Sequence, residues 1–172
     1  MVAKALAPSV DLSHGMKLLP AVLSMVAGSV DVISFLGLGG LFTAHITGNL
    51  VILASRIIHG GQGQLAAMIS VPVFIVVLAT TRLLAAGLEA IGIASLRPLL
   101  LLQLLLLVGF LALGVAAGPH INPNTAIAIA GGMFGVSAMA VQNALVQLSL
   151  KGAPSTAVMT TNITRFMICL LY

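Results

Sequence analysis

Residues 98–117 read PLLLLQLLLLVGFLALGVAA, and only Gln103 interrupts this apolar run. A helix rises about 1.5 Å per residue, so a stretch of this length extends for about 30 Å. That length matches the hydrocarbon core of a lipid bilayer. The stretch is therefore expected to cross a membrane as a helix.

The composition of the whole chain also indicates that it lies in a lipid bilayer. Of the 172 residues, 60% are hydrophobic and 6% are charged, whereas charged residues make up about a quarter of a soluble domain. The net charge of +4 is scattered through apolar sequence with few aromatic residues, which argues against a nucleic-acid partner. The composition predicts an integral membrane protein whose partner is the lipid bilayer.

The hydrophobicity pattern divides the chain into an exposed tail, 1–17, and one transmembrane domain, 18–172. The apolar segments are 18–38, 41–58, 65–88, 98–117, 125–150 and 153–172. A signal peptide is rejected because the first stretch is too long and carries Asp31. We therefore predict an all-α polytopic membrane helix bundle with about six apolar segments. The last one reaches Tyr172 with no closing cap, charge or turn, so we expect the natural chain to continue further.

The second segment is too short and too polar for a simple crossing. About 15 residues, or about 22 Å of helix, precede Arg56. The segment spans the bilayer only if Arg56 extends to the interface, and otherwise it is a half-helix or a re-entrant element. Both arrangements stay open.

The two arrangements differ in the distribution of positive charge. Full crossing divides six basic residues equally between the two sides, whereas a re-entrant second segment leaves Arg56 alone opposite the other five. Those five are Lys4, Lys17, Arg82, Arg97 and Lys151. Positive charge gathers on the cytoplasmic side of membrane proteins, so we expect a cytoplasmic N-terminus.

A short motif occurs twice and predicts an internal repeat. Residues 43–49 read TAHITGN and residues 156–162 read TAVMTTN, which share the pattern T-A-x-x-T-x-N. Asp31 lies 12 residues before the first copy, and Asn143 lies 13 residues before the second. The copies would cover about 18–59 and 130–172, parallel if the second segment crosses and inverted if it is re-entrant. Duplicated halves with broken helices are typical of transporters.

Three stretches carry a family resemblance: Gly28-Ser-Val-Asp31, the run FLGLGGLF at 35–42, and HITGN at 45–49. They resemble the signature of the YoaK-like bacterial membrane proteins over residues 18–172. The resemblance implies a multi-pass protein of the cell inner membrane and implies no substrate or reaction. Thr161 stands where that family usually has Gly, and Gln103 stands where an acid is expected.

Asp31 is the sharpest single indication of function. A carboxylate inside an apolar span costs a few kcal/mol unless it is protonated, paired or hydrated, and proton-coupled transport uses such groups. Alternatively, Asp31 caps a broken helix or pairs with His45 or Arg82. His45 is either a proton shuttle or an interior hydrogen-bonding residue, and at i, i+4 it would share a helix face with Asn49 if the segment is helical.

No enzyme is expected, because no hydrolase, nucleotide-binding or metalloprotease motif occurs in the sequence. With one cysteine, Cys169, and no paired histidines, neither a metal nor a cofactor is expected.

The sequence predicts a small-solute or proton-coupled secondary transporter or permease, with a non-transporting membrane scaffold or assembly partner as the alternative. Polar residues on membrane helices also hold neighbouring helices together, so both readings remain. Self-association into a homo-oligomer is left open. The candidate pathway residues are Asp31, Thr43, His45, Thr47, Asn49, Asn143, Thr156, Thr160 and Asn162.

Overall fold

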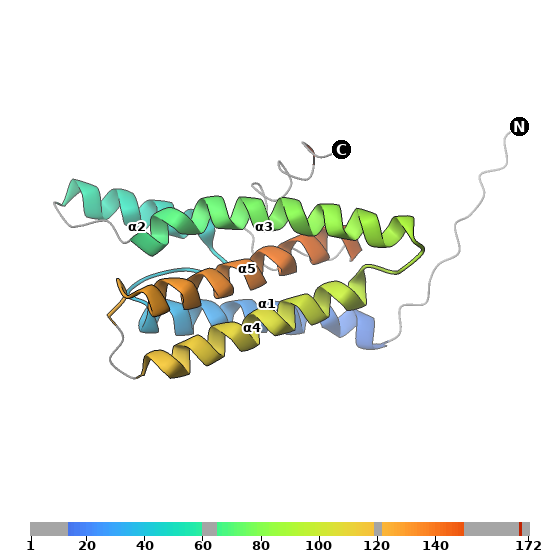
Figure 1. Ribbon diagram of the computed structural model, residues 1–172, viewed down its shortest axis with the longest axis horizontal. Coiled ribbons are helices and arrows are strands. Elements are labelled where there is room, and N and C mark those ends of the chain that lie inside the picture. Colours follow the sequence, from blue (N-terminus) through green and yellow to red (C-terminus); the bar gives the residue numbers. More distant parts are fainter. Residues whose placement is uncertain (1–13, 60–64, 119–121, 150–168, 170–172) are drawn as a thin grey trace, which may run out of the picture.

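The computed structural model describes residues 14–59, 65–118, 122–149 and 169, and within them the chain is entirely helical apart from its connections (Figure 1). The helices are α1 (His14–Gly37), α2 (Ile46–Ile58), α3 (Leu65–Ala90), α4 (Leu96–Ala117) and α5 (Ala126–Ser149). The last three agree with the expected segments within two residues at each end. α1 begins four residues before the expected Leu18.

Four of these helices, α1, α3, α4 and α5, are long and apolar enough to cross a membrane, which indicates a membrane protein. α2 has 13 residues and is too short. The expected sixth segment, 153–172, lies outside the described residues. Of the six predicted segments, the structure therefore describes five helices, and the second is shorter than expected.

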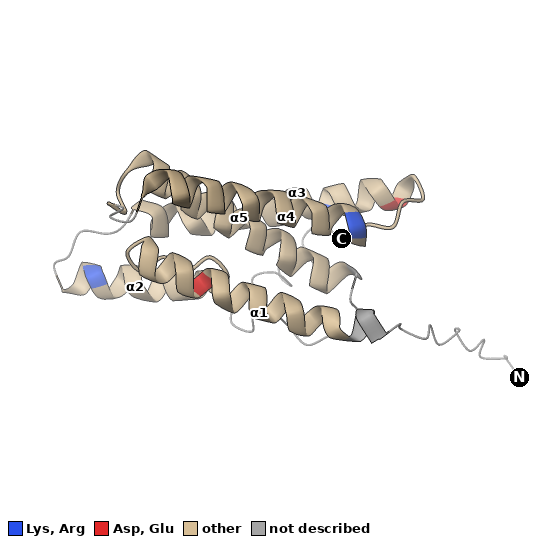
Figure 2. Ribbon diagram, turned by 90° about the horizontal axis from the view of Figure 1, so that it is seen from below, with Lys and Arg blue, Asp and Glu red and all other residues tan. Residues whose placement is uncertain are grey.

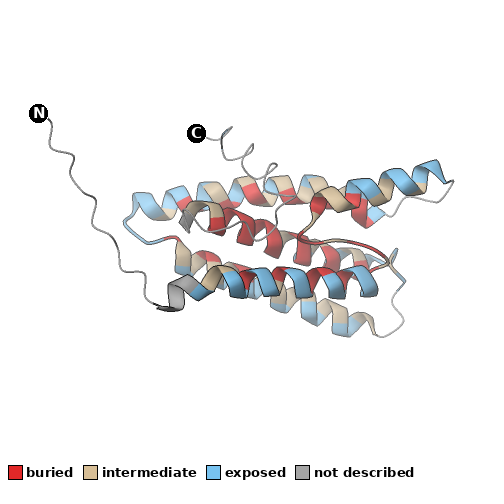
Figure 3. Cartoon of the chain, turned by 180° about the vertical axis from the view of Figure 1, so that it is seen from behind, coloured by how far each residue is buried: buried red, intermediate tan, exposed pale blue. Residues whose placement is uncertain are grey.

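α5 is the central helix of the bundle. It packs against α4 and α3 and also contacts α1, and Val136, Met139, Ala140 and Ala144 along it are completely buried. Figure 3 shows this helix as the most buried part of the structure. Its sequence is rich in glycine and alanine, and small residues let helices approach closely. α4, by contrast, buries only Leu99 and Gln103 and exposes Leu101, Leu104, Leu105 and Leu111, as a lipid-facing helix would.

The chain turns back on itself between α1 and α2. After α1 ends at Gly37, residues 38–45 turn back toward the middle of the bundle without forming a helix, and α2 then runs outward again in the same direction as α1 (Figure 1). The Arg56 guanidinium donates to the carbonyl of Gly39 at 2.9 Å, which places the outer ends of α1 and α2 side by side. The expectation of a helix from residue 41 is therefore wrong by five residues. This path of the chain has the geometry of a re-entrant element, and its position in a membrane stays a prediction.

This turn sets the direction of every later helix. α1 and α4 run one way along the long axis, and α3 and α5 run the other way (Figure 1). Arg97, in the first turn of α4, is therefore at the same end as the start of α1, and Arg56 is at the opposite end. Figure 2 shows charged residues mainly near the ends of the helices, with one acidic position within α1. α1 and α5 run in opposite directions (Figure 1). The predicted repeat is not tested by this, because most of its second copy lies outside the described residues.

We predict that a membrane-impermeant maleimide will distinguish this topology from full crossing. Single cysteines are introduced in a Cys169→Ser background at Gly37, His59, Ala94 and Asn124. Gly37→Cys, His59→Cys and Asn124→Cys should label from one side of the membrane, and Ala94→Cys from the other. If α2 crossed, Gly37→Cys would instead label together with Ala94→Cys, which would contradict the re-entrant arrangement.

Candidate functional site

The Asp31 carboxylate is the centre of a hydrogen-bonded network between α1 and the re-entrant loop. Its side chain is buried within α1, and Oδ1 accepts three hydrogen bonds. The donors are the backbone N–H of Thr43 at 2.7 Å, the hydroxyl of Thr43 at 2.9 Å and the backbone N–H of Ala44 at 2.6 Å. A single carboxylate oxygen thus satisfies two backbone groups that a bilayer would leave without partners.

His45 occupies the other oxygen of the same carboxylate. Its Nδ1 lies against Asp31 Oδ2, so of the two partners considered from the sequence, His45 is in direct contact. The His45 side chain is 39% exposed, against 6% for Asp31. Three donors engage Oδ1, so Oδ2 is the oxygen that faces the imidazole. The imidazole is therefore the exposed half of a buried acid–base pair.

Asn49 holds the loop from its other side. Its Oδ1 accepts from the backbone N–H of Phe42 at 2.8 Å, and its Nδ2 donates to the carbonyl of Phe42 at 2.7 Å and to Ser70 Oγ at 2.9 Å. Ser70 in turn donates to the carbonyl of Ala67 within α3. Asn49 therefore ties the loop to α2 and α3. His45 precedes α2, so the condition for a helix face shared with Asn49 is not met, and the two side chains bind different partners.

The loop lies against glycines of α5. A Cβ atom at Gly135 would stand 2.8 Å from Thr43 Cγ2, and one at Gly132 would stand 2.6 Å from Leu41 Cδ2. Contacts that short do not occur between real side chains, so a larger residue at either position would require the Thr43 or Leu41 side chain to move. The glycine-rich composition of this segment predicted close helix packing, but not that its partner is a loop.

The other candidate residues do not join this network. Thr47 has a buried hydroxyl with no hydrogen-bond partner, and Asn143 donates to the carbonyl of Met139 in its own helix at 2.9 Å. Thr156, Thr160 and Asn162 lie outside the described residues, so the second copy of the repeat remains a prediction. The structure brings together Asp31, Thr43 and His45, with Asn49 attached through Phe42.

Sequence reasoning missed a second polar connection. Gln103 Nε2 donates to Gln142 Oε1 at 2.7 Å, and Gln142 Nε2 donates to the carbonyl of Leu23 at 2.9 Å. This chain of amides links α4, α5 and α1 inside the bundle, where both glutamines are buried. The lone Gln103 in a leucine-rich span was the available signal, but its partner could not be identified from the sequence.

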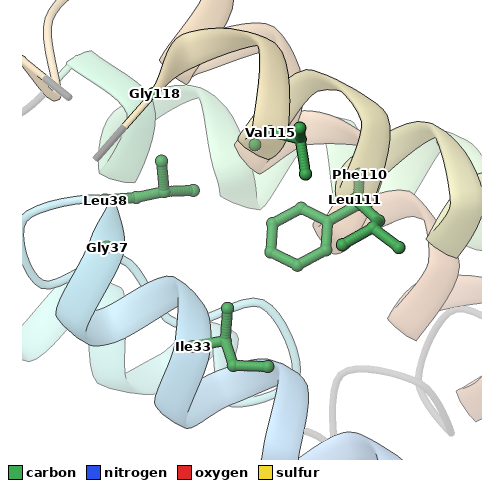
Figure 4. A pocket seen from close by; sticks show the side chains of 8 residues that line it. Ile33, Gly37, Leu38, Phe110, Leu111, Val115 and Gly118 are labelled. Atoms are coloured by element: carbon green, nitrogen blue, oxygen red, sulfur yellow. The ribbon is translucent and has the colours of Figure 1, made fainter. Parts of the chain in front are cut away.

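Two grooves accompany α1. One, of about 380 Å³, separates the ends of α1 and α4 and has apolar walls that include Ile33, Phe110 and Val115 (Figure 4). The other, of about 490 Å³, contains the Asp31–His45 pair. Its lining residues are Gly28, Asp31, Val32, Phe35, Leu36, Phe42 and His45. Only the second groove offers titratable groups, and the described residues contain no cluster of three metal-ligating side chains.

Comparison with known proteins places the chain in a family. A family model described as "Protein of unknown function (DUF1275)" matches residues 19–171, so the chain belongs to this family. No curated protein and no solved structure gives a significant match. The family description assigns no activity.

The first prediction from this site concerns Asn49. Asn49→Ala leaves both backbone groups of Phe42 without their side-chain partner, and an unsatisfied buried group costs about 1–3 kcal/mol. The matched control is Asn143→Ala, which removes one bond to a carbonyl on the same helix. The free energy of unfolding, measured in detergent, should fall more for Asn49→Ala than for Asn143→Ala. Equal losses would show that Asn49 does not hold the loop.

The second concerns Gly135. Gly135→Ala forces Thr43 outward, and overpacking of this kind costs about 1–3 kcal/mol. Gly87→Ala in α3 is the control, because its Cβ would meet nothing within 4 Å. The ¹⁵N chemical shifts of the His45 ring should change in Gly135→Ala and stay constant in Gly87→Ala. An unchanged His45 signal in both variants would show that the α5 glycines do not position the site.

Proposed function

We propose that this member of the DUF1275 family is a proton-coupled secondary transporter for a small solute, and not an enzyme. The observation that carries the proposal is the Asp31–His45 pair at the inner tip of a re-entrant loop. Within the family, its Asp31 and Thr-Gly-Asn signature resembles the YoaK-like proteins. We further propose a cell inner-membrane location with Arg97 on the cytoplasmic side and Arg56 opposite, as the distribution of positive charge favours.

The re-entrant loop supports the transport proposal because it would place non-helical backbone within the depth of the membrane. Non-helical backbone at membrane depth is tolerated only where protein buries it or where it lines a cavity. Residues 42–45 meet both conditions, since Asp31 and Asn49 satisfy the loop and His45 opens onto the groove. Broken segments of this kind form the substrate and ion sites of many transporters.

The proton would act by changing the strength of the hydrogen bonds that Asp31 accepts from the loop. When Asp31 is ionised, its three bonds to Thr43 and Ala44 are charge-assisted, and such bonds are about twice as strong as neutral ones. A proton on Oδ2 removes that assistance. His45 provides the route, because its ring contacts Oδ2 and is half-exposed to the groove. Proton binding would thus loosen the loop, and proton release would tighten it.

A scaffold remains the second candidate because part of the polar network only holds helices together. The Gln103–Gln142 bond and the Asn49–Ser70 bond are buried pairs of that kind. These bonds would stabilise the bundle whether or not the protein transports a solute. The two candidates differ in whether Asp31 must titrate.

Asp31→Asn separates them. Asparagine keeps the size of the side chain and an Oδ1 that can accept the three loop bonds, but it cannot titrate. Glu89→Gln, at the end of α3, is the matched acid-to-amide control. Proteoliposomes loaded with a bacterial metabolite extract are given a pH gradient of about one unit, and mass spectrometry measures which compounds cross.

The wild-type protein and Glu89→Gln should drive at least one compound toward a concentration ratio of up to about tenfold, the limit for one-to-one exchange. Asp31→Asn should match protein-free vesicles while reaching normal levels in the membrane. Transport that survives Asp31→Asn, or a wild type that moves nothing, contradicts the proposal. An Asp31→Asn protein that fails to accumulate assigns Asp31 a structural role and favours the scaffold.

A further inference from the structure

We propose that the groove beside Asp31 binds an organic cation, namely an amine or quaternary ammonium with a compact apolar body. This inference rests on the proposed function, because it names the class of solute that the same site would exchange for a proton.

The size and lining of the groove fit such a molecule. Its volume of about 490 Å³ lies within the range of small-molecule sites. Gly28, Val32 and Phe35 form one face of α1 along it, and an added Cβ at Gly28 would meet nothing within 4 Å. The rings of Phe35 and Phe42 stand 4.8 Å apart between centroids. Aromatic faces attract cations, and quaternary ammonium ions in particular.

The charge of the groove favours a cation that competes with a proton. Asp31 and His45 are its titratable residues. With a neutral imidazole the pair carries one negative charge, and with one additional proton it carries none. On α5, the residues against the loop include Gly132 and Gly135, which add no charge. A proton and a monovalent cation therefore neutralise the same site in turn.

One basic side chain lies close to a lining residue of the groove. Arg56 of α2 donates to the carbonyl of Gly39, and a Cβ atom at Gly40 would stand 3.3 Å from its guanidinium and 3.8 Å from the Phe35 ring. Arg56 itself is not a lining residue. Arg56 would weaken cation binding from outside, so Arg56→Gln should leave the affinity unchanged or raise it.

Other classes of ligand fit less well. A metal cation such as Ca²⁺ needs six or more oxygen ligands, whereas the lining side chains offer one carboxylate whose Oδ1 already accepts three bonds. A sugar needs many hydrogen-bonding partners, and only Asp31 and His45 are polar among the lining side chains. An anion would face the Asp31 carboxylate with no Lys or Arg in the lining.

The test uses benzyltrimethylammonium, whose charge does not titrate, and its neutral carbon isostere neopentylbenzene. Binding to the full chain in lipid nanodiscs is measured by equilibrium dialysis at pH 8 and pH 6. The cation should bind saturably at pH 8, with affinity falling by up to about tenfold per pH unit as protons compete. Neopentylbenzene at equal concentration should not displace it.

Two variants test the site independently. Asp31→Asn should lower the affinity at least tenfold and abolish its dependence on pH. Val32→Phe fills the groove without changing its charge and should block binding, whereas Val76→Phe, an equally exposed position on α3, should not. Val32→Phe keeps the test decisive if Asp31→Asn does not fold.

Equal binding of neopentylbenzene, a pH-independent affinity, or binding that survives Val32→Phe would overturn the inference. If the cation does not bind while the metabolite extract still shows transport dependent on Asp31, the substrate class is wrong and the proposed function stands. If the cation binds with the expected pH dependence but no compound crosses the vesicles, the site is confirmed and the transport proposal fails.

Discussion

The re-entrant loop depends on one interaction, the acceptance of two backbone N–H groups and a hydroxyl by Asp31 Oδ1. Water is absent from the bilayer core, so backbone groups that leave a helix there need a partner from the protein. Asp31 supplies it from α1, and Asn49 supplies it from α2 through Phe42. The cost of placing a carboxylate inside an apolar span is thereby offset by the groups that it satisfies. Without this exchange, the chain would have no stable way to turn back halfway.

The glycines of α5 are the steric counterpart of that interaction. Gly132 and Gly135 let the loop approach α5 closely, and a Cβ atom at either position would require the side chain of Leu41 or Thr43 to move. α5 is therefore buried for two reasons: it packs α3 and α4 on one side and receives the loop on the other. The same arrangement holds His45 at the edge of the bundle, where its ring contacts both the carboxylate and the groove.

The sequence predicted what depends on hydrophobicity alone. The limits of α3, α4 and α5 follow from apolar runs bounded by charge or turn residues, and Asp31 stood out because a carboxylate there needs an explanation. The direction of the second segment was not decided, because re-entrance depends on which backbone groups Asp31 satisfies, and periodicity carries no such information. Gln142 escaped notice for a similar reason, since its role depends on Gln103, 39 residues away in the chain. The repeat partner of Asn49, Asn162, lies outside the described residues.

The energy available for coupling can be bounded from the same three bonds. A proton can shift the loop only by the difference between its bonds to a carboxylate and its bonds to the neutral acid. Bonds to charged groups contribute about 1.5–3 kcal/mol and neutral ones about 0.5–1.5 kcal/mol, so three bonds differ by roughly 3 kcal/mol in total. Each 1.4 kcal/mol is about a tenfold change in population. Under the proposed mechanism, one proton on Oδ2 would therefore weaken the hold of Asp31 on Thr43 and Ala44 by about two orders of magnitude in population, while Asn49 keeps its bonds to Phe42.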